Sequence, residues 1–285
     1  MASMRDIKRR KSSIQSTQQI TKAMKLVSTV KLQRAKANAE KSDNYFRAMY
    51  NTVQSILART QNLEHRFLKP GEGGKKAVIV ITSNRGLAGG YNSNVIKLIT
   101  RGELANEDLC IYAIGKKGKE ALQKSYEIKA DYSAAIDEPA YAEAMVICKD
   151  VLNAFAEGEI SEIYLAYTAF KNTVVHIPTL LKLLPVEIDK SEEGMDVEDK
   201  ALMNFEPEDE EALELIIPKY ITSLIYGGMV ESVASENGAR MQAMDSATSN
   251  AEEMIEDLTL LYNRARQGSI TQELTEIIAG ANAIS

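Results

Sequence analysis

The distribution of proline limits the fold more than any other feature of this sequence. The six prolines fall at positions 70, 139, 178, 185, 207 and 218 and leave two long proline-free ends, residues 1–69 and 219–285. Because proline disrupts helix interiors, both ends can be helical over their whole length. At 1.5 Å per residue, helices over about residues 4–58 and 210–283 would be about 80 Å and 110 Å long, too long for one globular core. Pro218 lies within the second helical pattern, where it would kink the helix or mark its beginning.

Both ends carry the heptad spacing of a coiled coil, with apolar and small residues at alternating steps of three and four. The first series is Leu32, Ala35, Ala39, Ser42, Phe46, Met49, Val53 and Ile56, and the second is Met244, Ala247, Ala251, Met254, Leu258, Leu261 and Ala265. We expect the two ends to pack together as an antiparallel pair, with the middle of the chain inserted as a separate domain. Heptads alone also fit a spacer or a homodimer seam.

The middle of the chain alternates between strand-like and helix-like segments. Apolar, β-branched runs at Lys76–Ser83, Leu109–Gly115 and Ile163–Phe170 predict strands, and residues 91–104, 117–124 and 139–155 predict helices. Val174–Ile177 can pair with the last strand across a short turn. This alternation predicts an α/β fold with a mostly parallel, doubly wound sheet. The predicted domains are a shaft of residues 1–60 and 209–285 and a globular domain of residues 75–205.

The charge is strongly polarised, although the whole chain carries only −6. Residues 1–41 hold eleven basic and two acidic residues, a net +9, and residues 187–214 hold thirteen acidic and two basic residues, a net −11. Such an excess on one helix predicts an acidic protein partner, with a merely solvated face as the alternative. The residues between the basic positions are polar or small aliphatic, not the aromatic residues that stack on bases, so nucleic acid is not the expected partner.

The sequence offers little with which to build an active site. Its two cysteines, Cys110 and Cys148, and its two histidines, His65 and His176, show neither metal-ligand spacing nor a catalytic arrangement. No nucleophile-elbow, zinc-protease or P-loop motif occurs. We therefore expect no metal, no cofactor and no catalytic residue.

Two glycine-rich turns could hold a phosphate. The first, SNRGLAGGYN at residues 83–92, joins a predicted strand to a predicted helix, where backbone amides attract anions. Its glycine spacing is not GxGxxG, and no acid follows at the position that would bind a ribose. The second, GKKGK at residues 115–119, lacks the Ser or Thr with which a P-loop holds magnesium. A structural turn is favoured, and a nucleotide-dependent α/β enzyme with helical arms is the alternative.

Four stretches resemble the γ-subunit family of F-type rotary ATP synthases. They are residues 14–28 (IQSTQQITKAMKLVS), the turn at 83–92, residues 239–248 (ARMQAMDSAT) and residues 262–273 (YNRARQGSITQE), in the family's order from end to end. The resemblance implies that the terminal helices form a non-catalytic central stalk with a Rossmann-like insert at its base. Its rotation would couple ion flow through a membrane ring of c subunits to ATP synthesis or hydrolysis in the hexamer of α and β subunits, which hold the nucleotides.

The resemblance also implies which residues meet partners. Contacts with the β sleeve and the apolar bearing would come from Thr21, Lys22, Met24, Lys25, Lys31, Arg240, Arg264, Arg266, Gln267, Thr271, Gln272 and Thr275. Phe205 and Glu206 would form the foot toward the c ring and the small ε subunit. Basic residues between Met24 and Lys36 would attract acidic loops of β without one fixed partner, which suits a contact that is remade during rotation.

The resemblance further implies a peripheral location at the cytoplasmic face of a bacterial cell membrane. The N-terminus is charged without an apolar stretch behind it, and no window approaches about 18 uninterrupted apolar residues, so the membrane would be reached only through partners. The absence of a transit peptide favours a bacterial source, and the absence of an extra cysteine-bearing loop argues against the thiol switch of chloroplast relatives.

The sequence departs from the family at two positions. Phe205 stands where the family usually has tyrosine, and Pro218 falls in a stretch that is usually continuous helix. The coupling ion, proton or sodium, is left open. A nucleic-acid-binding coiled coil is a third hypothesis, which a salt-dependent gel shift caused by residues 1–41 would support.

Overall fold

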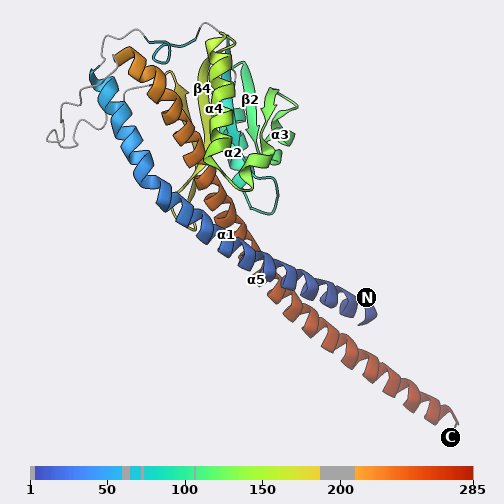
Figure 1. Cartoon of the computed structure of the whole chain (residues 1–285). Coiled ribbons are helices and arrows are strands. Elements are labelled where there is room, and N and C mark those ends of the chain that lie inside the picture. Colours follow the sequence, from blue (N-terminus) through green and yellow to red (C-terminus); the bar gives the residue numbers. More distant parts are fainter. Residues whose placement is uncertain (1–3, 60–64, 72–73, 106, 187–208, 285) are drawn as a thin grey trace. The chain divides into compact units, whose positions relative to one another are not determined.

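The computed structural model describes residues 4–59, 65–71, 74–105, 107–186 and 209–284. They belong to two compact units, one of residues Val30–Ala239 and one that joins Met1–Thr29 to Arg240–Ser285. Two long helices, α1 (Met4–Arg59) and α5 (Asp209–Ile284), contribute to both units (Figure 1). The prediction of long helices at both ends with an α/β domain inserted between them is confirmed.

The larger unit contains a five-stranded sheet in the order β3-β2-β1-β4-β5. Its strands are β1 (Lys75–Ile81), β2 (Leu109–Ile114), β3 (Glu127–Asp131), β4 (Ile160–Phe170) and β5 (His176–Leu184). β1 to β4 are parallel, and β5 runs antiparallel to β4. The chain places strands on both sides of β1, as in a doubly wound sheet. The predicted mostly parallel, Rossmann-like sheet is confirmed.

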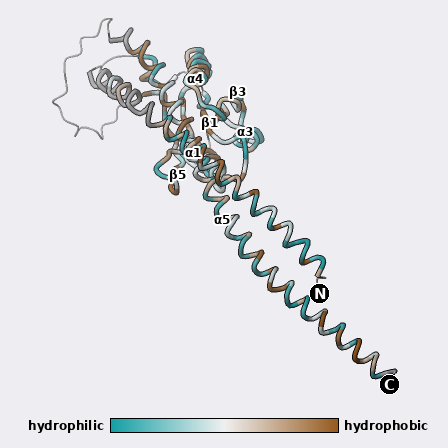
Figure 2. Tube along the Cα trace, turned by 60° about the horizontal axis from the view of Figure 1, so that its bottom comes forward, coloured by the Kyte–Doolittle hydropathy of each residue, from teal (hydrophilic) through white to brown (hydrophobic). Residues whose placement is uncertain are grey.

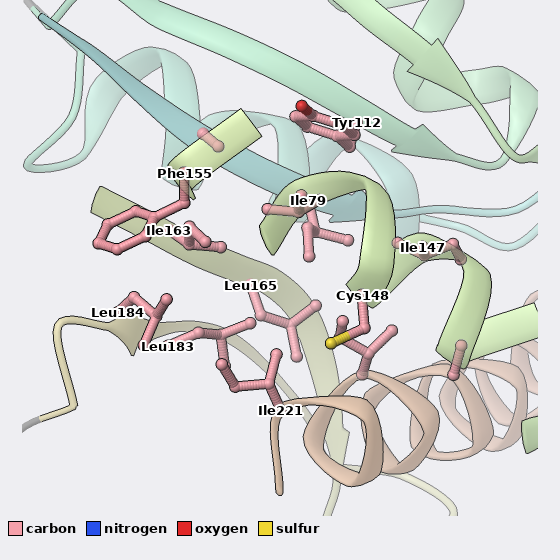
Figure 3. Packing of buried hydrophobic residues seen from close by; sticks show 14 of the residues in the cluster. Ile79, Tyr112, Ile147, Cys148, Phe155, Ile163, Leu165, Leu183, Leu184 and Ile221 are labelled. Carbon is pink, nitrogen blue, oxygen red and sulfur yellow. The ribbon is translucent and has the colours of Figure 1, made fainter. Parts of the chain in front are cut away.

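Helices cover both faces of this sheet, which explains why β1 and β2 are almost uninterruptedly apolar. α2 (Tyr91–Arg101) and α3 (Lys116–Leu122) pack on the face to which Val78 and Val80 point. α4 (Tyr141–Ala156) and the first part of α5 pack on the opposite face. There Ile79 and Leu165 of the sheet lie beside Ile147 of α4 and Ile221 of α5 (Figure 3).

The sequence patterns missed part of the sheet. β3 was not predicted, because its residues alternate between exposed and half-buried, as expected for an edge strand in which three of five side chains are charged. β5 continues to Leu184 although Pro178 lies within it. Proline is tolerated there because β5 is the last strand in the sheet, so no further strand needs its missing N–H.

Pro218 does not mark the beginning of α5, which starts at Asp209 and continues through the proline. That alternative was therefore wrong. Proline cannot donate the backbone hydrogen bond that the carbonyl of Glu214 would receive in a regular helix. The carbonyl of Pro218 itself accepts a hydrogen bond from the Thr222 hydroxyl at 2.7 Å and lies 3.4 Å from Sγ of Cys148 on α4. The proline turn is thus bonded to its own helix and to its neighbour.

The smaller unit is an antiparallel helix pair. Ile7, Thr21 and Ser28 of α1 are buried along one side, in steps that are multiples of seven, and so are Met244, Ala251 and Leu258 of α5. Figure 2 shows hydrophilic and hydrophobic residues following one another along both helices. The antiparallel coiled-coil pairing of the two ends is confirmed, but with a seam that is partly polar.

The predicted heptad residues are only partly correct. Leu32 and Ala35 pack against Ala234 in the larger unit, and Met49 packs against the core of the sheet. In the second series Met254 and Leu261 are exposed, at 43% and 50%. Half-buried Ile255 and Tyr262 take those places. The remaining predicted positions are partly buried (Ala39, Ala247, Ala265) or fall among side chains outside the described set (Ser42, Phe46, Val53, Ile56).

Candidate partner-binding surfaces

Three polar contacts in successive turns join the helices of the smaller unit. Gln18 donates a hydrogen bond to Glu252 at 2.9 Å, the hydroxyls of Thr21 and Thr248 share one at 2.8 Å, and Lys25 pairs with Asp245 at 2.5 Å. Thr21 also lies 3.0 Å from the Gln18 carbonyl, so its hydroxyl is satisfied although the residue is only 8% exposed. These contacts fix which residues lie opposite one another, because polar pairs tolerate little sliding.

The structure divides the residues that the sequence predicted for a β sleeve. Thr21 lies between the helices, Lys25 is paired with Asp245, and Arg240 is only 9% exposed. Lys22 is exposed and Met24 half-buried in the same unit, and Lys31 is exposed in the larger unit. Lys22 and Lys31 make no ion pair with any residue that the structure describes. These two lysines are therefore the most available of the predicted basic contacts on α1.

The last part of α5 extends past the described start of α1 (Figure 1). Since Gln18 lies opposite Glu252 and both helices rise equally per residue, Met4 lies opposite about residue 266. The predicted contacts near this level, Arg264 and Arg266, and those beyond it, Gln267, Thr271, Gln272 and Thr275, are all exposed. The polar ones bond within the helix, as when Gln272 donates to Glu276 at 2.9 Å.

Sequence reasoning missed the apolar residues of this stretch. Ile270, Leu274, Ile277 and Ile278 are 48% to 67% exposed. Their spacing of four, three and one places them on one helix face, a signal that was readable in the sequence. Contiguous exposed apolar residues on a folded chain mark a surface that another molecule covers. The predicted foot residues Phe205 and Glu206 lie outside the described residues.

The glycine-rich turns are filled by the chain's own side chains. The backbone N–H of Ser83 donates to Asn92 at 2.9 Å, that of Lys116 donates to Asn84 at 3.0 Å, and that of Gly118 donates to Thr82 at 2.8 Å. Phosphate sites in such folds depend on free amides at these positions. A Cβ on Gly118 would lie 2.7 Å from the Thr82 hydroxyl, so the glycine serves this close internal contact.

A cavity of about 440 Å³ opens at the amino-terminal ends of the parallel strands, beside Cys110 and Tyr112. The glycine-rich turns lie at the other ends of these strands. Two ion pairs cross it, Lys75–Glu127 at 2.7 Å and Lys129–Glu159 at 2.8 Å. Burial raises the pKa of the Cys110 thiol to about 11, which keeps it protonated and unreactive at neutral pH. The paired charges and the protonated thiol supply no nucleophile, acid or base poised for chemistry.

Among the described residues, no group of three or more His, Cys, Asp and Glu side chains could hold a metal ion. Within that same part of the chain, α5 alone is long and apolar enough for a membrane span, with a best window of mean hydropathy 1.2. Of this window, 56% is buried inside the protein, as in the core helix of a folded domain.

Comparisons with known proteins agree along the whole chain. The ATP synthase family model matches residues 3–284. The ATP synthase gamma chain of Lachnoclostridium phytofermentans is 64% identical over 291 residues and covers 100% of both chains. A gamma chain of Acetobacterium woodii described as sodium ion specific is 40% identical and covers 99% of both.

Solved structures share the fold. A chain of the mitochondrial ATP synthase of Euglena gracilis matches 99% of this chain and 94% of its own length, with a TM-score of 0.66 and 19% identity. A chain from the central stalk and c ring of the Tetrahymena thermophila enzyme matches 80% of this chain and 99% of its own length, with a TM-score of 0.60 and 24% identity. With a family model and full-length relatives in agreement, the chain belongs to the gamma-chain family of the ATP synthases.

Proposed function

We propose that this chain is the non-catalytic central rotor shaft of an F-type ATP synthase. Its rotation couples ion flow through a membrane c ring to ATP synthesis or hydrolysis in a hexamer of α and β subunits. The full-length match at 64% identity to a bacterial gamma chain carries this proposal. The antiparallel helix pair supports it, because two packed helices resist bending and twisting better than one.

The proposal includes a division of labour along the chain. Residues 1–60 and 209–285 form the shaft, and residues 75–205 form the globular domain at its base. The partners are the α and β subunits, the ε subunit and the c ring, and the chain lies at the cytoplasmic face of a bacterial cell membrane, which it meets only through them. Phe205 and Glu206 belong to the foot. The sodium-specific relative leaves proton and sodium as alternative coupling ions.

Reconstitution tests the rotor function directly. α and β subunits, membrane sector and ε are assembled in vesicles with or without this chain, an ion gradient is imposed, and ATP synthesis is measured. We expect synthesis only when the chain is present, since the orientation of an asymmetric shaft is what makes the three β sites differ in affinity. Equal synthesis without the chain would refute the rotor function.

Lys22 and Lys31 give the clearest test of the proposed basic contact, because they are the predicted lysine contacts on α1 that are exposed and make no ion pair within the described residues. Lys22→Gln/Lys31→Gln should weaken binding of the chain to the α and β subunits about two- to tenfold at low salt, because each exposed charge contributes modestly. Raising the ionic strength should shrink the difference, because salt already screens the attraction in the parent. The measurement is a titration of αβ assembly at two salt concentrations.

Lys124→Gln/Lys149→Gln is the matched control, because it removes the same charge from exposed positions of the globular domain. We expect it to bind as the parent does. A binding loss of equal size in this control would show that net charge, and not the place of Lys22 and Lys31 on α1, governs assembly.

A further inference from the structure

β4 is longer than its parallel neighbour β1. The last β1–β4 pair is Val80 with Ala166, while β4 continues to Phe170 and pairs there only with β5. Because successive residues of a strand direct their backbone groups to opposite sides, alternate residues after Ala166 face the side on which β1 has ended. Buried backbone groups need partners, so something other than a strand must supply them.

Three side chains of α5 supply these partners. The N–H of Thr168 donates to the Ser232 hydroxyl at 3.3 Å, and the Ser235 hydroxyl donates to the Thr168 carbonyl at 3.2 Å. The N–H of Phe170 donates to the Glu231 carboxylate at 3.1 Å. Ser232 and Ser235 are fully buried. Glu231, Ser232 and Ser235, called the strand clamp below, thus take the place of the missing strand.

Glycines on both sides of the strand clamp bring the helix backbone onto the sheet. A Cβ on Gly228 would lie 3.1 Å from Leu165 of β4, and a Cβ on Gly238 would lie 2.6 Å from the His176 ring of β5. Both distances are shorter than ordinary van der Waals contact. At these two positions the backbone of α5 therefore lies directly against side chains of β4 and β5, with no side chain of its own between them.

We propose that Glu231, Ser232 and Ser235 are positioning residues for rotary coupling, which fix α5 in rotation on the sheet of the globular domain. This inference rests on the proposed function. Hydrophobic packing of α5 on the same sheet is non-directional and resists turning of the helix about its own axis only weakly. Hydrogen bonds from three side chains to a strand backbone are directional, so a small turn of α5 breaks them.

The strand clamp needs a hydrogen-bond acceptor at residue 231 but does not need a charge there. Burial raises the pKa of Glu231 above its usual value, so the ionised carboxylate is held there at a cost. Glutamine keeps an acceptor oxygen of the same shape without that cost. Leucine keeps a similar volume and removes the acceptor. Glu231→Gln and Glu231→Leu therefore separate hydrogen bonding from packing.

The test compares Ser232→Ala/Ser235→Ala and Glu231→Leu with two controls, Glu231→Gln and Ser223→Ala. Ser223 is also buried on α5, but its hydroxyl donates to the Lys219 carbonyl of its own helix at 2.9 Å. The full chain is assembled with its partner subunits. Amide hydrogen exchange is measured at Thr168 and Phe170, and ion pumping per ATP hydrolysed is measured in vesicles.

In the double serine variant we expect exchange at Thr168 to quicken at least about tenfold, the equivalent of one lost hydrogen bond. Glu231→Leu should do the same at Phe170. The number of ions pumped per ATP should fall in both variants while ATP hydrolysis continues. The reason is that α5 could then turn relative to the sheet of the globular domain, so part of the rotation of the shaft would not be transmitted. Both controls should behave as the parent.

The outcomes separate the two levels of the proposal. Unchanged exchange at Thr168 and Phe170 would overturn the strand clamp itself. Faster exchange with unchanged pumping per ATP would overturn its part in coupling. An equal response of Ser223→Ala would overturn both, because it would reveal general loosening of α5. Failure of the rotor function is recognised differently, by synthesis in vesicles that lack the chain altogether.

Discussion

Asp131 illustrates how a side chain at the end of an edge strand stabilises two neighbours. Its carboxylate accepts a hydrogen bond from Lys119 at 2.7 Å and from the N–H of Ser133 at 3.0 Å. Through Ser133 it holds the start of the short helix η1 (Ser133–Ile136). The Lys119 ammonium, followed by the Ser133 hydroxyl, lowers the pKa of Asp131 to about 2. The ionised form is therefore the one that the fold favours.

Asp131→Asn should lower the free energy of unfolding by about 1 kcal/mol at pH 7, a value reduced from the full shift because the pair is partly exposed to solvent. The unfolded carboxyl has the higher pKa, so the stabilisation is complete above pH 4 and disappears as the pH falls from about 4 to about 2. Urea unfolding of parent and variant over this range measures it. A difference that stays constant down to pH 2 would contradict the assignment.

Leu87 is a residue whose conformation no sequence pattern indicated. It has a positive φ of 63° and is 64% exposed, in the turn between β1 and α2. Non-glycine residues rarely adopt this conformation. The sequence located the turn through its glycines, but which residues take positive φ depended on hydrogen bonds such as that from the Ser83 hydroxyl to the Arg85 carbonyl, which only the structure shows.

At the scale of elements, the helix pair shows where periodicity succeeds and where it fails. Met244, Ala251 and Leu258 were placed correctly in the seam. The intermediate positions were displaced by one residue; in one of them the seam contains a polar residue, Thr248, which pairs with Thr21. Polar pairing between two distant helices leaves no trace in the local pattern of either, so the register could not be predicted.

The Thr21–Thr248 pair allows a quantitative test. Thr21→Val/Thr248→Val should leave the stability of the helix pair unchanged or raise it, because both partners become apolar with the same shape. Each single substitution should cost less than about 1 kcal/mol, since the remaining hydroxyl can donate to a carbonyl of its own helix. For Thr248 that carbonyl is Met244, at 2.7 Å. Thermal unfolding of the four chains gives the coupling energy.

A double variant less stable than either single variant would contradict this account of the seam. It would show that the shared hydrogen bond contributes more than the burial of two additional methyl groups. The neighbouring pair Lys25–Asp245 serves as an internal comparison, because its contribution, unlike that of the threonines, should fall with added salt.

At the scale of the whole molecule, the end of α5 is the part that most clearly requires a partner. Ile270, Leu274 and Ile277 are exposed on one face, beyond the described start of α1. Backbone amides of a lone helix end open readily, because no packing stabilises them. Amide exchange over residues 270–278 should slow at least about tenfold when the chain is assembled with α and β subunits.

The same residues should exchange rapidly in the free chain, while those of β1 and β4 stay protected in both states, because the strands are buried in the larger unit. Equal protection of residues 270–278 before and after assembly would show that this face is not the one that the partners cover.

Much of the molecular organisation could be predicted from residues alone, because the signals were local. The long proline-free ends indicated α1 and α5, although α5 continues through Pro218, and β-branched runs located β1, β2 and β4. What could not be predicted depends on contacts between distant segments. The bonds of Ser232 and Ser235 to β4 require knowledge of which strand a helix covers. The same holds for partner surfaces, which are defined by another molecule.

The internal bonding of the glycine-rich turns has a consequence for how such a subunit works among others. A Rossmann-like sheet offers a crevice suited to nucleotides, yet here Thr82, Asn84 and Asn92 occupy the amides that would grip a phosphate. In the rotor function proposed above, these two turns would therefore not compete for the nucleotides of the neighbouring subunits, and the chain would act on those subunits through its position.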